Sequence, residues 1–473
     1  MTRQATLEQP PEKGKPTGSM GVAACTALVI GNMIGSGVFL LPSALADYGT
    51  LALAGWGLST AGSLVLAVMF ARLSGAIPAA GGPYAYTRLA FGEFAGFLAV
   101  WCYWKAAWIG NAAIALSLVG YLSVFIPGLT HAGVASGAAI AAVCLCTLIN
   151  IAGIRTFSNL NLVLTVLKLI PLVAVATLGW WFFSPSEIVV PAYGVTIPET
   201  NGIAAVATAA TLTMWSFIGL ESATVPAENV RDPRRTIPRA TLIGTIATAV
   251  VYVLAVTAVQ GIVPAKTLAN SSAPFADAAT RMVGAWGGIV IAAGAIAATF
   301  GALTGWVLMQ GQIPWAAARD GLLPSFLGRL NRKGVPANAL LTSGVLVTLL
   351  LLIEGRGSLT EVFRVIILVG TMTTLVPYAL CAAAVLQLLV DRPGLFGAKA
   401  AAAMATIGMV AFAYSVWELY GSGESAIFWG FLVTIGGIPF YTWRKWRDRD
   451  HIGERKNAKE AVGQNQAGSL RAS

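Results

Sequence analysis

The chain has 473 residues, of which 56% are hydrophobic and only 11% are charged, and its mean hydropathy is +0.74. Soluble domains carry roughly 25% charged residues, so this composition excludes a soluble multidomain enzyme. The formal net charge of +10 fits either a nucleic-acid-binding protein or a membrane protein with basic loops, and the position of the cations decides between the two.

Apolar stretches of about 20 residues, each able to cross roughly 30 Å of hydrocarbon as a helix, recur along the chain. We predict twelve transmembrane helices, and therefore an all-α polytopic membrane protein. Their approximate ranges are 21–45, 50–73, 94–126, 132–153, 160–183, 203–226, 238–263, 284–312, 338–354, 360–388, 398–418 and 424–442. This single membrane domain, residues 21–442, lies between an N-terminal tail, residues 1–20, and a basic C-terminal tail, residues 443–473.

The loops between these spans alternate in charge. Most lysines and arginines fall in the two tails and in the loops on the same side, whereas the other side has only Lys266, Arg281, Arg356 and Arg364. The positive-inside rule then predicts that both termini are cytoplasmic, in the cell (inner) membrane. This distribution explains the basic charge, so we expect the lipid bilayer, and no nucleic acid, as a partner.

Two spans are interrupted by glycines and small polar residues. The first contains GNMIGSGV at residues 31–38, and the sixth contains MWSFIGLESA at residues 214–223. Broken helix at bilayer depth is tolerated only where the freed backbone groups line a cavity, although small-residue helix packing is an alternative explanation. Breaks in the first and sixth spans favour two inverted repeats of five helices, at about 21–183 and 203–388, followed by helices 11 and 12 at about 398–442.

The two breaks offer complementary binding groups. The half-helix after the first break directs its amides and the positive end of its dipole at the gap, which suits a carboxylate. Carbonyls exposed near Trp215, Ser216 and Ile218 suit an ammonium group. Three aromatic residues, Tyr103, Trp215 and Trp306, could box a cation if they converge on one cavity, or could simply pack in the core.

We identify three ionisable side chains inside the predicted spans, where a charge is costly and commonly functional. Glu221 follows the sixth-span break and could contact a cationic substrate, gate the cavity, exchange a proton, or make a structural hydrogen bond. Lys168 in the fifth span and Lys105 in the third could carry a proton or stand where a sodium ion would otherwise bind. Snorkelling toward the interface is the alternative role for both lysines.

Enzymatic and cofactor chemistry find little support in the sequence. The only histidines, His131 and His451, fall outside the spans, and the chain has no phosphate-binding loop of the Walker type. We therefore expect no metal, no cofactor and no enzymatic activity, and any transport is expected to be independent of ATP bound to this chain.

Six motifs occur in order along the chain. They are GNMIGSGVFLLP at 31–42, GGPYAY at 81–86, WIGN at 108–111, WSFIGLESA at 215–223, DPRR at 232–235 and LVPY at 375–378. In combination they resemble the basic amino acid/polyamine antiporters of the APC (amino acid, polyamine, organocation) superfamily, among which the arginine/agmatine antiporter is the most similar. The resemblance covers roughly residues 21–443.

The resemblance implies a LeuT-type 5+5 inverted-repeat fold, with helices 1 and 6 unwound at mid-membrane, assembled as a homodimer. It also implies a substrate pocket lined by Asn32, Met33, Gly35, Ser36, Gly37, Tyr103, Ala106, Ala107, Asn111, Ile114, Trp215, Ser216, Ile218, Trp306 and Gly370. No cofactor is implied.

The same resemblance implies a role for each group. Ser36 and Gly37 would bind the substrate carboxylate, and the carbonyls of Trp215, Ser216 and Ile218 would bind its α-amino group. The Trp215 ring would stack on the substrate side chain, and Trp306 would close one side of the pocket. Glu221 and Tyr378 would belong to gates, Tyr84 resembles a tyrosine linked to pH response, and Lys168 is a candidate for coupling.

Three departures bear on the substrate. Gly370 stands where the arginine/agmatine antiporter has a serine near the guanidinium group, and Lys105 and Lys168 replace apolar residues. A protonated lysine close to the pocket would repel a cationic substrate. Lys168 instead resembles the fifth-helix lysine of sodium-independent, proton-coupled amino acid permeases.

The sequence therefore favours a sodium-independent transporter that exchanges an amino acid for its decarboxylated amine, with arginine and agmatine as the expected pair. The alternative is a proton-coupled permease or exporter of neutral amino acids that uses Lys168.

Overall fold

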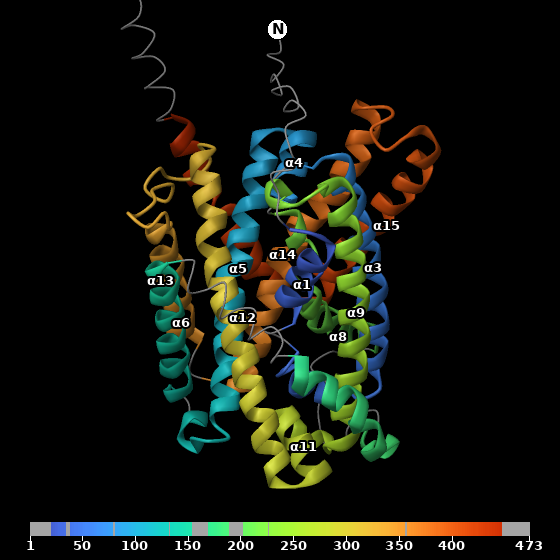
Figure 1. The fold of residues 1–473 in the computed structure, drawn as a ribbon, viewed down its shortest axis with the longest axis vertical. Helices are drawn as coiled ribbons and strands as arrows, with labels where there is room; N and C mark the ends of the chain where they lie inside the picture. The colour runs from blue at the N-terminus through green and yellow to red at the C-terminus, as the bar shows by residue number, and fades with distance from the viewer. Residues whose placement is uncertain are drawn as a thin grey trace, which may run out of the picture.

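The computed structural model describes residues 20–34, 38–78, 81–131, 133–153, 169–188, 202–225, 227–354 and 357–446. These residues form an elongated bundle of helices, with α4 at one end and α11 at the other (Figure 1). We call these two ends the α4 end and the α11 end. Within the described ranges the β-type pairing is an isolated bridge between Met20 and Val230.

Long helices make up most of the bundle. They are α3 (Leu51–Ala76), α5 (Glu93–Leu122), α6 (Val134–Ala152), α9 (Pro233–Ile262), α12 (Ala285–Arg319), α13 (Ala337–Glu354), α14 (Leu359–Asp391), α15 (Ala401–Gly421) and α16 (Gly423–Ile435). The shorter helices are α1 (Val22–Met33), α2 (Leu41–Leu45), α4 (Pro83–Phe91), α8 (Gly202–Met214), α10 (Ala265–Leu268) and α11 (Pro274–Val283).

Nine helical segments of the described chain are long and apolar enough to cross a membrane. Three further apolar helices are shorter, namely Val22–Met33, Leu169–Phe182 and Ala337–Ile353. Each of these segments overlaps one of the ranges expected from hydropathy, although several extend beyond it by a few residues, and together they show a multi-pass membrane protein. The full count of twelve spans, the repeat boundaries and the tail assignments stay predictions, and residues 1–19, 154–168 and 447–473 lie outside the described part.

Helix α5 lies at the centre of the packing. In its most apolar window 89% of the residues are buried inside the protein, compared with 22% and 17% for the last two spans. Helices α12 and α14 make the most extensive contacts with α5. A helix that is apolar all round and buried by its neighbours belongs to a protein core, while α15 and α16 keep large apolar side chains exposed, as lipid-facing helices do.

Neither the first nor the sixth predicted span is a continuous α-helix. Helix α1 ends at Met33, and α2 begins only at Leu41. Helix α8 ends at Met214, and a 3-10 turn follows at Trp215–Phe217. The backbone is then extended at Ile218 and has a positive φ of 108° at Gly219. A residue other than glycine rarely adopts that φ.

The two interruptions meet at Gly219. A Cβ atom added to this glycine would lie 3.2 Å from the backbone carbonyl carbon of Asn32. The close approach of the two backbones therefore needs a glycine for space as well as for conformation.

Three short helices were not expected from hydropathy, namely α4, the single turn α10, and α11. Helix α4 follows α3 and precedes α5, while α11 follows α9 and α10 and precedes α12, at the opposite end of the bundle (Figure 1). All three are short and carry ionisable side chains, so a search for long apolar stretches passes over them. A short helix placed after the second helix of each half, at opposite ends, is the arrangement that an inverted repeat would give.

Candidate functional site

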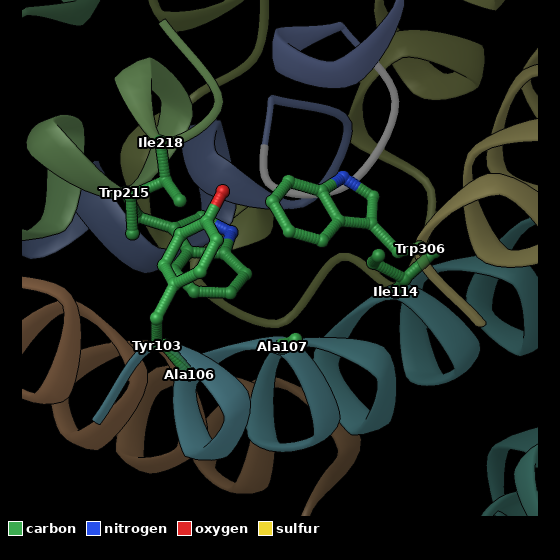
Figure 2. Close-up of a pocket in the computed structure, with 8 residues that line it drawn as sticks. Tyr103, Ala106, Ala107, Ile114, Trp215, Ile218 and Trp306 are labelled. Carbon is green, nitrogen blue, oxygen red and sulfur yellow. The ribbon is translucent and has the colours of Figure 1, made fainter. Parts of the chain in front are cut away.

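A small pocket lies where α5, the sixth-span break and α12 face one another (Figure 2). Its lining consists of Tyr103, Ala106, Ala107, Gly110, Ile114, Trp215, Ile218 and Trp306. The cavity of about 10 Å³ has room for about one water molecule. A larger ligand therefore needs the aromatic side chains to move apart.

Seven of the residues expected to line a pocket do so, namely Tyr103, Ala106, Ala107, Ile114, Trp215, Ile218 and Trp306. They come from three elements that are distant in sequence, and the rings of Tyr103, Trp215 and Trp306 surround the cavity (Figure 2). The sequence analysis did not include Gly110, although it lies one turn from Ala106 and Ala107 on the same face of α5.

The end of α1 contacts the same site through backbone atoms. Trp306 donates its indole N–H to the carbonyl oxygen of Asn32 at 3.1 Å, and Tyr252 donates its hydroxyl to the carbonyl oxygen of Met33 at 2.6 Å. These bonds satisfy carbonyl groups that the ending helix leaves free. Gly35, Ser36 and Gly37, which complete the first break, lie outside the described residues.

Asn111 and Ser216 lie beside the pocket and are absent from its lining. The Asn111 amide nitrogen donates to Gln310 Oε1 at 2.7 Å and joins α5 to α12. Ser216 is 1% exposed, and its hydroxyl has no hydrogen-bond partner within the described part of the chain.

The Trp215 ring fits between two glycines. A Cβ atom at Gly110 of α5 would lie 2.7 Å from Trp215 Cη2, and one at Gly370 of α14 would lie 2.8 Å from Trp215 Cζ3. Gly370 therefore acts on the pocket through the position of Trp215. Any side chain at either glycine would displace the indole ring.

Glu221 is fully buried and receives three hydrogen bonds. Tyr103 donates its hydroxyl to Oε1 at 2.6 Å, Tyr378 of α14 donates to Oε2, and the backbone N–H of Gly219 donates to Oε2 at 3.2 Å. Hydrogen bonds of this number stabilise a carboxyl group that is removed from water. Glu221 and Tyr378, both predicted as gating residues, therefore lie together with Tyr103.

A second, larger hollow approaches the site from the α4 end. Its volume is about 390 Å³, and its lining includes Tyr84 of α4, Asn229, Trp315 of α12 and Tyr103. Tyr103 lines both the small pocket and this hollow. The side chain that donates to Glu221 thus separates the two spaces.

Tyr84 lies at the mouth of the hollow, in a network of charged side chains. Its hydroxyl donates to Asp320 Oδ2 at 2.7 Å and accepts from Arg88 Nη1 at 2.8 Å. Arg88 lies 3.7 Å from both Asp320 and Glu93, and Glu93 pairs with Lys445. Burial, followed by the hydrogen bond to Asp320, raises the pKa of the Tyr84 hydroxyl well above its usual value.

Lys105 points away from the pocket. It is two residues from Tyr103 and from Ala107, which is roughly 200° around the helix axis. Its ammonium group donates to Thr434 Oγ1 at 3.2 Å and lies 5.7 Å from the centre of the Trp101 ring. Lys105 is therefore not part of the pocket lining, and α5 lies between its ammonium group and the pocket. Lys168 lies outside the described residues.

Glu418 is a buried ionisable residue that the sequence analysis missed. It lies in the last turn of α15, its exposed fraction is 0%, and Oε2 accepts a hydrogen bond from Thr211 of α8 at 2.8 Å. The predicted span 398–418 ended at this glutamate, and the sequence analysis did not count it among the ionisable side chains of the spans. Extending the span by one turn, as the structure does, would have identified it.

We predict that Tyr84 supports the fold without titrating in the acid or neutral range. Because its pKa is raised in the folded protein, the stability that its protonated hydroxyl contributes is fully present below the unfolded value of about 10 and is lost only as the pH rises through the folded value. Tyr84→Phe should lower the free energy of unfolding by about 1 kcal/mol. The melting temperature of each protein is measured from acid to neutral pH. The difference between the two melting temperatures should be the same throughout this range, and a difference that changes with pH there would contradict this account.

Comparison with known proteins gives consistent results. The family model for amino acid permeases matches residues 20–442. The chain is 36% identical to the cadaverine/lysine antiporter of Escherichia coli K12, over 76% of this chain and 81% of that protein. It is 33% identical to the putrescine transporter PotE of the same organism, over 89% of this chain and 95% of that protein.

A second PotE, from Haemophilus influenzae, is also 33% identical, over 89% of this chain and 96% of the relative. All three relatives are transporters, and the match covers the whole helical bundle. This chain is accordingly a multi-pass membrane protein and not an enzyme. It belongs to the amino acid permease family of the APC superfamily, together with the basic amino acid/polyamine antiporters.

Proposed function

We propose that the chain is a sodium-independent secondary transporter that exchanges a basic amino acid for its decarboxylated amine by alternating access. It would do so as a twelve-helix, LeuT-type protein in the inner membrane, with both termini cytoplasmic, assembled as a homodimer. The observation that carries the proposal is the position of the pocket, which lies at the junction of the two interrupted spans and beside a fully buried carboxyl group.

The pocket supports binding of an organic cation. Trp215 and Trp306 present aromatic faces to it (Figure 2), and such faces attract ammonium and guanidinium groups. The apolar surfaces of Ala106, Ala107 and Ile114 suit a methylene chain. We assign the substrate carboxylate to Ser36 and Gly37 and the α-amino group to carbonyls of the sixth-span break, with the aliphatic side chain between the two tryptophans.

Glu221, Tyr103 and Tyr378 form the proposed gate toward the α4 end. Their hydrogen bonds close the space between the pocket and the larger hollow. A cationic substrate that reaches Glu221 offers its carboxyl group a partner to replace a tyrosine hydroxyl. Exchange of these partners would open the path while the carboxyl group stays satisfied.

Arginine and agmatine are the substrate pair that the sequence favours, and lysine and cadaverine are the second candidate. The second pair is supported by the cadaverine/lysine antiporter among the relatives and by Gly370, which supplies no hydroxyl for a guanidinium group. Lys105, on the far face of α5, contacts neither cation directly. Proton-coupled transport of a neutral amino acid through Lys168 is the remaining alternative.

Counterflow in proteoliposomes tests the exchange. Liposomes are loaded with unlabelled arginine, agmatine, lysine, cadaverine, ornithine, putrescine or a neutral amino acid, and uptake of labelled arginine and of labelled lysine is followed without sodium. We expect uptake only into liposomes that contain a basic amino acid or its amine. Uptake of a neutral amino acid into unloaded liposomes, driven by an inward proton gradient, would contradict antiport and favour the Lys168 alternative.

The packing of the Trp215 ring between Gly110 and Gly370 gives a second prediction. Gly370→Ala places a methyl group about 2.8 Å from the indole ring, and overpacking of this kind costs about 1–3 kcal/mol. The affinity for the substrate identified by counterflow should fall by about 10- to 100-fold, measured by equilibrium binding to the purified protein.

Gly305→Ala is the matched control, because a Cβ at this α12 glycine meets nothing within 4 Å. It should bind substrate as the wild-type protein does. Equal affinities of Gly370→Ala and Gly305→Ala would show that Trp215 does not form the pocket wall.

A further inference from the structure

Helix α15 approaches α8 very closely at its last turn. A Cβ atom at Gly421 would lie 2.3 Å from the carbonyl oxygen of Ala207 and equally close to Thr211 Oγ1. About two turns earlier on α15, the Tyr414 ring packs against Gly62 of α3, where a Cβ would lie 2.0 Å from the ring. Glu418 is therefore held in a dry contact between helices, and neither Glu418 nor Thr211 is measurably exposed.

The hydrogen bonds of this contact are too few for a carboxylate. Thr211 Oγ1 lies 2.8 Å from Glu418 Oε2, 2.9 Å from the Glu418 carbonyl oxygen and 3.1 Å from the Ala207 carbonyl oxygen. A hydroxyl has one hydrogen to donate, so it serves only one of these three oxygens fully. Glu418 Oε1 has no hydrogen-bond partner among the residues that the structure describes.

A neutral carboxyl group satisfies the same atoms better. The acid hydrogen of Glu418 can then be donated to Thr211 Oγ1, and the hydrogen of Thr211 is free for the carbonyl oxygen of Ala207 or of Glu418 itself. An ionised Glu418 would instead be a buried charge that is served only by hydroxyl groups, with Oε1 unpartnered among the described residues, which is a costly arrangement in a membrane interior.

Among the described residues, no positively charged side chain lies beside Glu418 to offset the cost of ionising it. Helix α8 has no ionisable side chain, and Arg72 of α3 and Lys399 before α15 lie near the far ends of their helices. On α14, Glu361 caps its own helix with Ser358, and Arg364 pairs with Asp47. Tyr414 also faces Glu418: its hydroxyl interacts with the carboxyl group and lies 3.4 Å from the Met214 sulfur. Glu424 is exposed at the start of α16.

Helix α8 connects this contact directly to the substrate site. Thr211 lies four residues, or about one turn, before Trp215, and α8 ends at Met214 where the break begins. In alternating access one group of helices rocks against another around the site. A movement of α8 away from α15 would remove the Thr211 hydroxyl from Glu418 and admit water between the helices.

We propose that Glu418 is a proton-binding site, neutral while α8 lies against α15, which releases its proton to water when α8 moves during substrate exchange. The coupling of proton release to substrate exchange rests on the proposed transport function, whereas the protonation of Glu418 does not depend on it. It assigns to α15 a carboxyl group that responds to pH separately from Glu221, which lies on the opposite side of the sixth-span break.

Infrared difference spectroscopy of the purified full-length protein tests the protonation without any substrate. The carbonyl band of a protonated carboxylic acid should be present at neutral pH in the wild-type protein and should disappear as the pH is raised. Glu418→Gln should remove this band, whereas Glu424→Gln, which neutralises an exposed glutamate nearby, should leave it unchanged. A spectrum of Glu418→Gln identical to that of the wild-type protein would overturn the proposal.

The Thr211 hydroxyl provides a second variant that keeps the carboxyl group. Thr211→Val removes the only hydroxyl hydrogen that an ionised Glu418 could accept from Thr211 and leaves a more apolar site, so the pH at which the band is lost should rise by about one unit, a roughly tenfold tighter proton affinity. Thr211→Ser should restore the wild-type value. An unchanged pH midpoint in Thr211→Val would contradict the assigned hydrogen bond.

Counterflow at varied pH tests the coupling. Glu418→Gln keeps a side-chain donor for Thr211 and imitates the neutral state, so its exchange rate should lose the pH dependence that Glu424→Gln retains. Loss of the infrared band with an unaltered pH profile would overturn the coupling. If no variant and no wild-type protein exchanges any tested substrate, the proposed transport function fails while the infrared result still decides the protonation of Glu418.

Discussion

A carboxyl group buried in a membrane protein needs hydrogen-bond donors, and Glu221 obtains its donors from three separate parts of the chain. Tyr103 reaches it from α5, Tyr378 from α14, and the amide of Gly219 from the sixth-span break itself. These bonds fix the broken segment against the two helices that form the centre of the bundle. Oε1 depends on Tyr103 alone, so removal of that donor would leave a buried oxygen unsatisfied, whereas Oε2 has two donors. The position of the break therefore depends on all three elements.

Close contacts made by glycine allow this geometry. Gly219 admits the Asn32 backbone, Gly110 and Gly370 admit the Trp215 ring, and Gly421 admits α8. In a bilayer, lipid tails satisfy apolar side chains as well as a neighbouring helix does, so close backbone approach and hydrogen bonding carry much of the association. The same contacts leave little free space, which explains why the pocket in this conformation is small and why binding requires the aromatic side chains to move.

Much of the fold could be predicted from hydropathy, because the spans are long, apolar and separated by basic or polar loops. The interruptions after Met33 and Met214 were visible as glycine and small polar residues at bilayer depth. The short helices α4 and α11 were missed because neither has a long apolar stretch. The far end of α12 was missed as well, since this helix continues to Arg319 beyond the expected boundary at residue 312.

The site was harder to predict than the spans. Residues on one face of α5, such as Tyr103 and Ala107, follow from helical spacing once the resemblance places them in a pocket. The direction of Lys105 could not be assigned because it depends on which neighbour packs against each face of α5, and its partner Thr434 of α16 lies 329 residues away along the chain. The contact of Glu418 with Thr211 likewise depends on tertiary packing between two apolar helices.

The measurement that tests the central claim most directly is counterflow by the Glu221→Gln variant in sealed proteoliposomes, with Glu424→Gln as the matched control. Replacing the buried carboxyl group by an amide removes its charge and one acceptor, so the account predicts that exchange falls by at least about 100-fold, equivalent to about 2.7 kcal/mol, while the purified variant stays folded. Exchange at the wild-type rate in Glu221→Gln would contradict the assignment of this carboxyl group to the gate of the pocket.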